Sequence, residues 1–169
     1  LGKLQADGKL DFDEKVTTYV PEVAFYNDYL TDNVTVRDLT CHRTGIPRHD
    51  FSWYLNGTSR DSLVQRIRYM ENFANLREKW YYNNFMFLLQ GVISEKLYGK
   101  SWEDNISEQF FQPLGMTNSN FAVWAKDYPD EAKGYYTDDK NVIKPPDYYK
   151  IAGMGPAGSI FSNPVEMAN

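Results

Sequence analysis

The run from Phe85 to Leu97 places the strongest constraint on what this chain can fold into. Its apolar residues recur three or four positions apart, at Phe85, Leu88, Leu89, Val92, Ile93 and Leu97. This spacing matches one face of an α-helix with 3.6 residues per turn. Gly99 follows the last apolar residue and is typical of a helix C-terminus. The pattern therefore predicts a buried helix that begins near Phe85 and ends at Gly99.

Two polar residues, Tyr82 and Asn84, lie directly before this apolar face. A phenol and a carboxamide at the start of a buried helix need hydrogen-bonding partners. One alternative is that Tyr82 is a packed aromatic residue whose hydroxyl bonds a backbone carbonyl. Another is that Asn84 is only the N-cap of the helix. Both alternatives compete with a role for the pair in a functional site.

Composition excludes several classes of function. The 169 residues fit one domain, and the formal net charge of −5 argues against a nucleic-acid partner. The longest apolar-rich stretch without charge, 80–94, is too short to span a bilayer. Cys41 is the only cysteine, so an internal disulfide is excluded. These features indicate a soluble globular domain without a membrane span in this segment.

Capping residues predict the other elements. Helices are expected after Thr35, after Ser59 as far as about Glu71, and after Ser101. Residues 28–33 are expected to form a turn, and short strands, with a hairpin near 138–139, are expected after residue 120. The chain opens and closes on helical patterns, which predicts a domain cut at both ends. Roles for the segments 48–80 and 121–150 stay open.

His42 suggests either a metal ligand or a residue that braces its loop. His49 and Asp50 follow it, but Gly45 and Pro47 break the segment between them. The chain has no second cysteine and no His-x-x-x-His spacing. We therefore expect no metal site and a bracing role for His42.

Four segments, in this order, resemble motifs of the serine β-lactamase and penicillin-binding-protein superfamily, in the branch that holds class C β-lactamases, D-aminopeptidases and esterases. The first two are ADGKLDFDEKV at 6–16 and LTCHRTGIP at 39–47. The third is the Tyr-x-Asn motif at 82–84, followed by Gly91 and Glu95, and the fourth is GPAGSIFS at 155–162. The resemblance covers nearly the whole chain, and the gaps between the motifs also fit.

The resemblance implies acyl transfer through a serine nucleophile. By this resemblance, Tyr82 is the base that takes the serine proton, and Asn84 is the amide that orients the substrate and a lysine. A tyrosine needs a nearby cation to act as a base near neutral pH. Gly155, Gly158 and Ser159 would contact the substrate.

Two family motifs are missing from the 169 residues. No serine is followed three residues later by lysine, and neither Lys-Thr-Gly nor His-x-Gly occurs. The chain therefore resembles the helical lobe of the fold, and we expect the nucleophile and the sheet lobe to lie outside it. On its own, this piece is expected to be inactive.

The expected fold is mainly α with a few short strands, a single partial domain spanning 1–169. The expected function is that of a serine hydrolase that cleaves a β-lactam, a D-amino peptide or a small ester without a metal or organic cofactor. Its partner would be a small-molecule or peptide substrate. Family resemblance favours a periplasmic or extracellular location. The alternative is a non-catalytic relative that keeps the cleft for binding or scaffolding.

Overall fold

The structure, a computed structural model, describes residues 1–54, 57–121, 131–144 and 151–169. It is helix-rich, as predicted, and the regular elements in these residues are short apart from one. The α-helices are α1 (Gly2–Ala6), α2 (Val16–Tyr19), α3 (Asp28–Asn33), α4 (Val36–Thr40), α5 (Arg60–Arg66), α6 (Asn84–Tyr98) and α7 (Trp102–Ile106). Short stretches of 3-10 or π helix are η1 (Asp50–Ser52), η2 (Ile67–Tyr69), η3 (Ser107–Phe111), η5 (Ala152–Ala157) and η6 (Glu166–Ala168).

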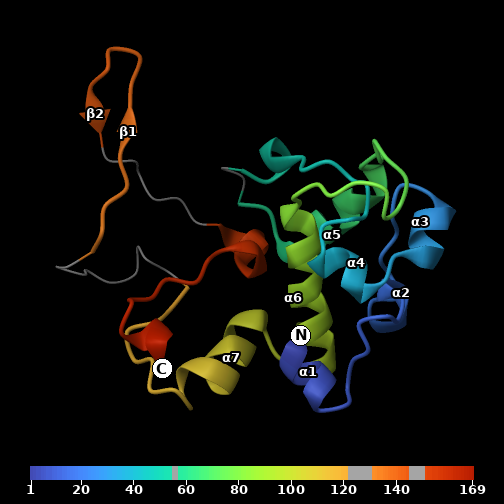
Figure 1. Cartoon of the computed structure of the whole chain (residues 1–169), viewed down its shortest axis with the longest axis horizontal. Coiled ribbons are helices and arrows are strands. Elements are labelled where there is room, and N and C mark those ends of the chain that lie inside the picture. The colour runs from blue at the N-terminus through green and yellow to red at the C-terminus, as the bar shows by residue number, and fades with distance from the viewer. Residues whose placement is uncertain (55–56, 122–130, 145–150) are drawn as a thin grey trace.

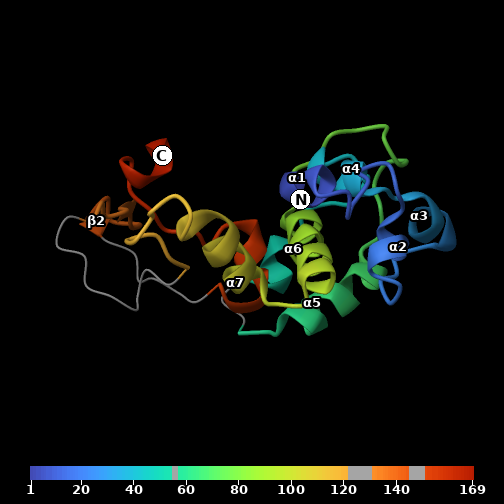
Figure 2. The same cartoon turned by 90° about the horizontal axis from the view of Figure 1, so that it is seen from below.

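Helix α6 is the predicted buried helix and forms the centre of the molecule. It runs from Asn84 to Tyr98 and ends at Gly99, whose φ of 69° is the left-handed conformation that glycine adopts readily. Figures 1 and 2 show α2, α3 and α4 on one side of α6 and α7 on the other. Burial extends beyond the predicted apolar stripe, because Met86, Gly91 and Ser94 are also buried.

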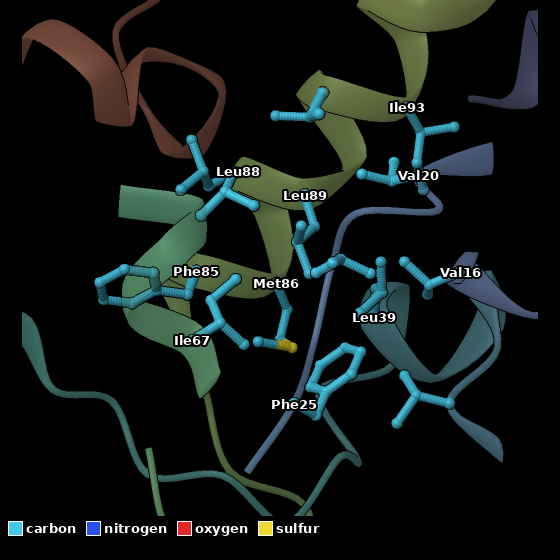
Figure 3. Close-up of a cluster of buried hydrophobic side chains, with 14 of the residues drawn as sticks. Val16, Val20, Phe25, Leu39, Ile67, Phe85, Met86, Leu88, Leu89 and Ile93 are labelled. Atoms are coloured by element: carbon cyan, nitrogen blue, oxygen red, sulfur yellow. The ribbon is translucent and has the colours of Figure 1, made fainter. Parts of the chain in front are cut away.

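The hydrophobic core lies on the side of α6 that faces the N-terminal helices. Figure 3 shows Leu89 and Ile93 of α6 on the side of Val16, Val20 and Leu39. Phe25 and Ile67 lie beside Met86. Each of these side chains is almost completely removed from water. Burying one such side chain contributes about 1.5–3 kcal/mol to folding, so this cluster determines how α2, α4 and η2 pack around α6.

The segment 28–33 forms helix α3, so the predicted turn is wrong. Asn27 caps this helix, because its side chain accepts a hydrogen bond from the backbone N–H of Leu30 at 2.9 Å. Leu30 is buried, while most of the neighbouring residues are exposed. A six-residue helix with one core residue has no recognisable apolar period, which is why the pattern was missed.

Arg60 joins four elements that lie apart in the sequence. Its guanidinium binds Glu95 of α6 and donates to Glu103 of α7 at 2.8 Å. Its Nε donates to the backbone oxygen of Gly153 in η5 at 3.1 Å. Because Arg60 is the first residue of α5, one side chain links α5, α6, α7 and η5.

The predicted hairpin is present as β1 (Tyr136–Thr137) and β2 (Ile143–Lys144). The strands are antiparallel and pair Tyr136 with Lys144. Figure 1 shows the hairpin standing apart from the helices. In the described part of the chain, no helix has both the length and the apolar composition that a membrane crossing requires.

Gly91 marks the closest approach between α6 and η5. A Cβ atom at Gly91 would lie 2.2 Å from Cγ of Pro156, a distance that requires the two elements to separate. We predict that Gly91→Ala lowers the free energy of unfolding by about 1–3 kcal/mol through overpacking. The control is Gly2→Ala in α1, where a Cβ would meet nothing within 4 Å. Chemical denaturation of both variants measures the difference, and equal stability would contradict the predicted packing.

Candidate functional site

Tyr82 lies in the extended segment immediately before α6. Its side chain is 37% exposed, and its hydroxyl makes no hydrogen bond within the described residues. The ring lies 4.7 Å from the ring of His42, centroid to centroid, and the guanidinium of Arg48 lies 4.9 Å from the Tyr82 centroid. The structure therefore gives no support to the alternative in which the Tyr82 hydroxyl bonds a backbone carbonyl. The phenol is accessible and has a cation beside it.

Asn83 is the residue that caps α6. Its Oδ1 accepts a hydrogen bond from the backbone N–H of Phe85 at 2.9 Å, and its Nδ2 donates to the carbonyls of Ile46 and Pro47 at 3.1 and 2.9 Å. The side chain is fully buried. Asn83 thus holds the loop at 46–47 against the start of the helix. The capping role that the sequence allowed for Asn84 belongs to Asn83.

Asn84 is the first residue of α6, and its side chain points to the loop after Pro47. Its Nδ2 donates to Oδ1 of Asp50 at 3.2 Å. The same Asp50 carboxylate accepts from Trp53 Nε1 at 3.2 Å and from Arg48 Nε at 2.7 Å. Asp50 therefore orients the carboxamide of Asn84 and the guanidinium of Arg48 together.

His42 braces the start of α6, as the sequence predicted. Its Nδ1 accepts a hydrogen bond from the backbone N–H of Asn83 at 3.2 Å, and its ring stacks on Phe87 of α6 with centroids 5.0 Å apart. Burial lowers the pKa of His42 below its usual value. This favours the neutral imidazole, which is the form that can accept a hydrogen bond at Nδ1.

The glycine-rich segment at 155–159 packs against α6, apart from Tyr82 and Asn84. Gly155 belongs to η5, and its carbonyl accepts the backbone N–H groups of Gly158 and Ser159, each at 3.0 Å. The Oγ of Ser159 is buried without a hydrogen-bond partner among the described residues. η5 packs on α6 at Gly91, two turns beyond Asn84. Within the described ranges, no hydrogen bond or ring contact joins Gly155, Gly158 or Ser159 to Tyr82 or Asn84.

A cavity of about 190 Å³ opens on the face of α6 between α1 and α7. Its lining includes Leu1, Phe87, Gly91, Trp102 and Pro156. Phe87 also stacks on His42, so this cavity and the surroundings of Tyr82 share a wall. No group of three or more His, Cys, Asp or Glu side chains that could hold a metal ion exists in the described ranges.

Sequence reasoning missed Arg48 and Asp50 as members of the site. Both lie in a loop that was given no role, and Asp50 is 34 positions before Asn84. His49 between them adopts a left-handed conformation with a φ of 50°. Nothing in the local pattern signals that these side chains converge.

A comparison with protein families shows which family the chain belongs to. The model of the beta-lactamase family matches residues 1–169. The chain belongs to the β-lactamase family. The match confirms the family resemblance seen in the motifs, and the structural neighbours confirm the predicted fold class, the helical part of the β-lactamase and transpeptidase-like fold.

Two curated relatives show how widely the sequence has diverged. The chain is 34% identical over 101 residues to an unguisins hydrolase of Aspergillus campestris, covering 57% of the chain and 19% of the relative. It is 27% identical over 168 residues to a putative penicillin-binding protein of Bacillus subtilis, covering 98% of the chain and 40% of the relative. The chain thus spans less than half the length of these relatives.

Solved structures agree with the β-lactamase assignment. The octameric penicillin-binding protein homologue from Pyrococcus abyssi superposes with a TM-score of 0.81 at 27% identity, over 98% of this chain and 39% of that one. A D-amino acid amidase from Ochrobactrum anthropi, bound to L-phenylalanine amide, has a TM-score of 0.77 at 24% identity over 97% of this chain and 48% of its own. The second likeness concerns the fold alone. Together with the family match, these comparisons show that the chain has part of the β-lactamase fold.

Proposed function

We propose that residues 1–169 form one wall of the active site of a serine hydrolase that cleaves amide or ester bonds through an acyl-serine intermediate. The observation that carries this proposal is the conformation of residues 82–84 at the start of α6. Tyr82 is accessible beside a guanidinium, and Asn84 is held in place by the carboxylate of Asp50. This arrangement presents a phenol and a carboxamide together at the edge of a rigid helix.

Tyr82 is proposed as the general base. It would accept the hydroxyl proton of the serine while the serine Oγ forms a bond to the carbonyl carbon of the substrate, and return a proton to the leaving group. The guanidinium of Arg48 lies 4.9 Å from the centroid of the Tyr82 ring, at the edge of the proposed site.

Asn84 is proposed as the orienting amide. Its Nδ2 is bound to Asp50, which fixes the plane of the carboxamide and leaves Oδ1 as an acceptor for an ammonium or amide N–H. In the proposed site, Oδ1 would hold the lysine of a Ser-x-x-Lys motif or the amide of the substrate. Gly155, Gly158 and Ser159 are proposed to contact the substrate from η5 and the residues after it.

The nucleophile is proposed to lie outside residues 1–169, in a longer protein of which this is one partial domain. None of the nine serines in the chain is followed three residues later by lysine. Two relatives that match nearly the whole chain are more than twice as long. The proposed substrates are a β-lactam, a D-amino peptide or a small ester.

Turnover measured on two forms of the protein tests this function. One form is the full-length protein, meaning residues 1–169 with all sequence encoded beside them, and the other is residues 1–169 alone. A panel of chromogenic β-lactams, D-amino acid anilides and aryl esters is expected to be hydrolysed by the full-length protein only. Hydrolysis by residues 1–169 would overturn the partial-domain proposal. Absence of turnover by the full-length protein would favour the non-catalytic binding or scaffolding protein instead.

A further inference from the structure

We propose that Arg48 binds an anionic group of the substrate, a carboxylate above all, next to Tyr82. This inference rests on the proposed function, because it assigns the substrate class of the same site. Arg48 would then decide specificity: amides or esters that carry a carboxylate near the scissile bond would be preferred over their neutral counterparts.

Two contacts fix the orientation of the Arg48 guanidinium. Its Nε donates to Oδ2 of Asp50 at 2.7 Å, and its central carbon lies 4.9 Å from the ring centroid of Tyr82. Asp50 is itself held by Asn84 and by Trp53. A guanidinium held at one edge and over a ring is preorganised, so little side-chain entropy remains to be lost when a ligand binds.

The remaining donors of Arg48 are unused among the residues that the structure describes. Within the described residues, neither Nη1 nor Nη2 has a hydrogen-bond partner, and 48% of the side chain is exposed to solvent. The planar pair of Nη groups matches the two oxygens of a carboxylate, and such charge-assisted bonds are stronger than neutral ones. An accessible pair of donors beside the proposed base is therefore available to a substrate.

Asp50 does not make the site specific for a cationic substrate. Its Oδ1 already accepts from Asn84 and from Trp53, and its Oδ2 accepts from Arg48. In the described part of the chain, three donors thus occupy this carboxylate, whereas Arg48 uses only its Nε. The local arrangement favours binding of an anion over binding of an ammonium group.

A matched pair of ligands tests this inference directly. N-acetyl-D-alanyl-D-alanine and its C-terminal amide differ only in whether the terminal group is a carboxylate or a neutral amide. The full-length protein is expected to bind the acid about tenfold or more tightly than the amide, as measured by isothermal titration calorimetry. In Arg48→Gln the ratio of the two dissociation constants should fall to near one, and Arg48→Lys should keep part of the preference.

Arg68→Gln is the control for loss of charge. Arg68 is an exposed arginine in η2 that lies over the ring of Tyr69, so the variant removes the same charge and the same type of ring contact elsewhere. It should leave the ratio unchanged. The inference is overturned when the unmodified protein shows no preference for the acid, or when Arg48→Gln keeps the preference.

Hydrolysis of the same two ligands separates the two proposals. A preference in binding that depends on Arg48, without release of D-alanine or D-alaninamide, would support the anion site and contradict the hydrolase. Release of both products at equal kcat/KM, unaffected by Arg48→Gln, would support the hydrolase and contradict the anion site.

Discussion

Replacing Tyr82 by phenylalanine in the full-length protein should lower kcat/KM for its best substrate by about 10²–10⁴-fold. This is the range that a positioned general base contributes, and only the hydroxyl group is removed. Because the hydroxyl makes no hydrogen bond in the described part of the chain and the ring contacts to His42 and Arg48 are kept, the fold should be unaffected. Steady-state kinetics and thermal melting measure the two effects separately.

The matched control for Tyr82→Phe is Tyr81→Phe. Tyr81 is the preceding residue, is exposed to a similar extent and contacts Phe73 through its ring with centroids 5.0 Å apart. Loss of its hydroxyl should leave kcat/KM within about twofold, since it has no part in the proposed proton transfer. Equal loss of activity in the two variants, or full activity in Tyr82→Phe, would contradict the role of Tyr82 as the base.

Replacing Asp38 by alanine should lower the free energy of unfolding by about 3 kcal/mol, because a fully buried carboxylate with several charge-assisted hydrogen bonds is lost. The Asp38 side chain is fully buried between two arginines, with Oδ1 2.6 Å from Arg43 Nε and Oδ2 2.8 Å from Arg77 Nη2. It also completes the capping box of α4 by accepting the backbone N–H of Thr35 at 3.0 Å. Urea denaturation monitored by tryptophan fluorescence measures the loss.

Asp13→Ala is the control for Asp38→Ala. Asp13 forms a similar two-bond pair with Arg37, at 2.6 and 2.8 Å, but both side chains are exposed. An exposed ion pair is screened by solvent and contributes little, so this variant should have nearly normal stability. A loss as large as that of Asp38→Ala would show that burial of Asp38 is not what makes it important.

The pKa of Asp38 predicts how the free energy of unfolding changes with pH. Burial alone would raise the pKa of Asp38, but hydrogen bonds from Arg77, Thr35 and Arg43 outweigh burial and hold its pKa below the usual value. Because the pKa is lower in the folded state, ionised Asp38 contributes its full stability above the ordinary aspartate pKa of about 3.9. That contribution should be lost as the pH falls through the lower folded pKa. Between pH about 3.9 and the lower folded pKa, the free energy of unfolding should fall less in Asp38→Asn than in the unmodified protein.

The central helix and most helix starts could be predicted because their signals are local. Thr35, Ser59 and Ser101 each cap the expected helix through a side-chain hydrogen bond three residues on. The start of α6 was predicted within one residue, although the capping side chain proved to be that of Asn83. Helix α3 was missed because Leu30 is its one buried residue, which leaves no period to detect.

The candidate site could be predicted only in part, for a related reason. The sequence pattern and the family resemblance together pointed to Tyr82 and Asn84, which flank one helix start. Arg48 and Asp50 reach the same place through a loop whose path depends on Asn83 holding the carbonyls of Ile46 and Pro47. A contact between residues more than thirty positions apart is a tertiary feature, so neither periodicity nor capping rules predict it.

The central claim is that this chain contributes the base and the orienting amide but not the nucleophile. Mass spectrometry of the full-length protein after reaction with a slowly deacylating β-lactam or an aryl fluorophosphonate tests it most directly. The account predicts one adduct per molecule, on a serine outside residues 1–169 that is followed three residues later by lysine, and much slower labelling in Tyr82→Phe. An adduct on any of the nine serines within residues 1–169 would contradict it.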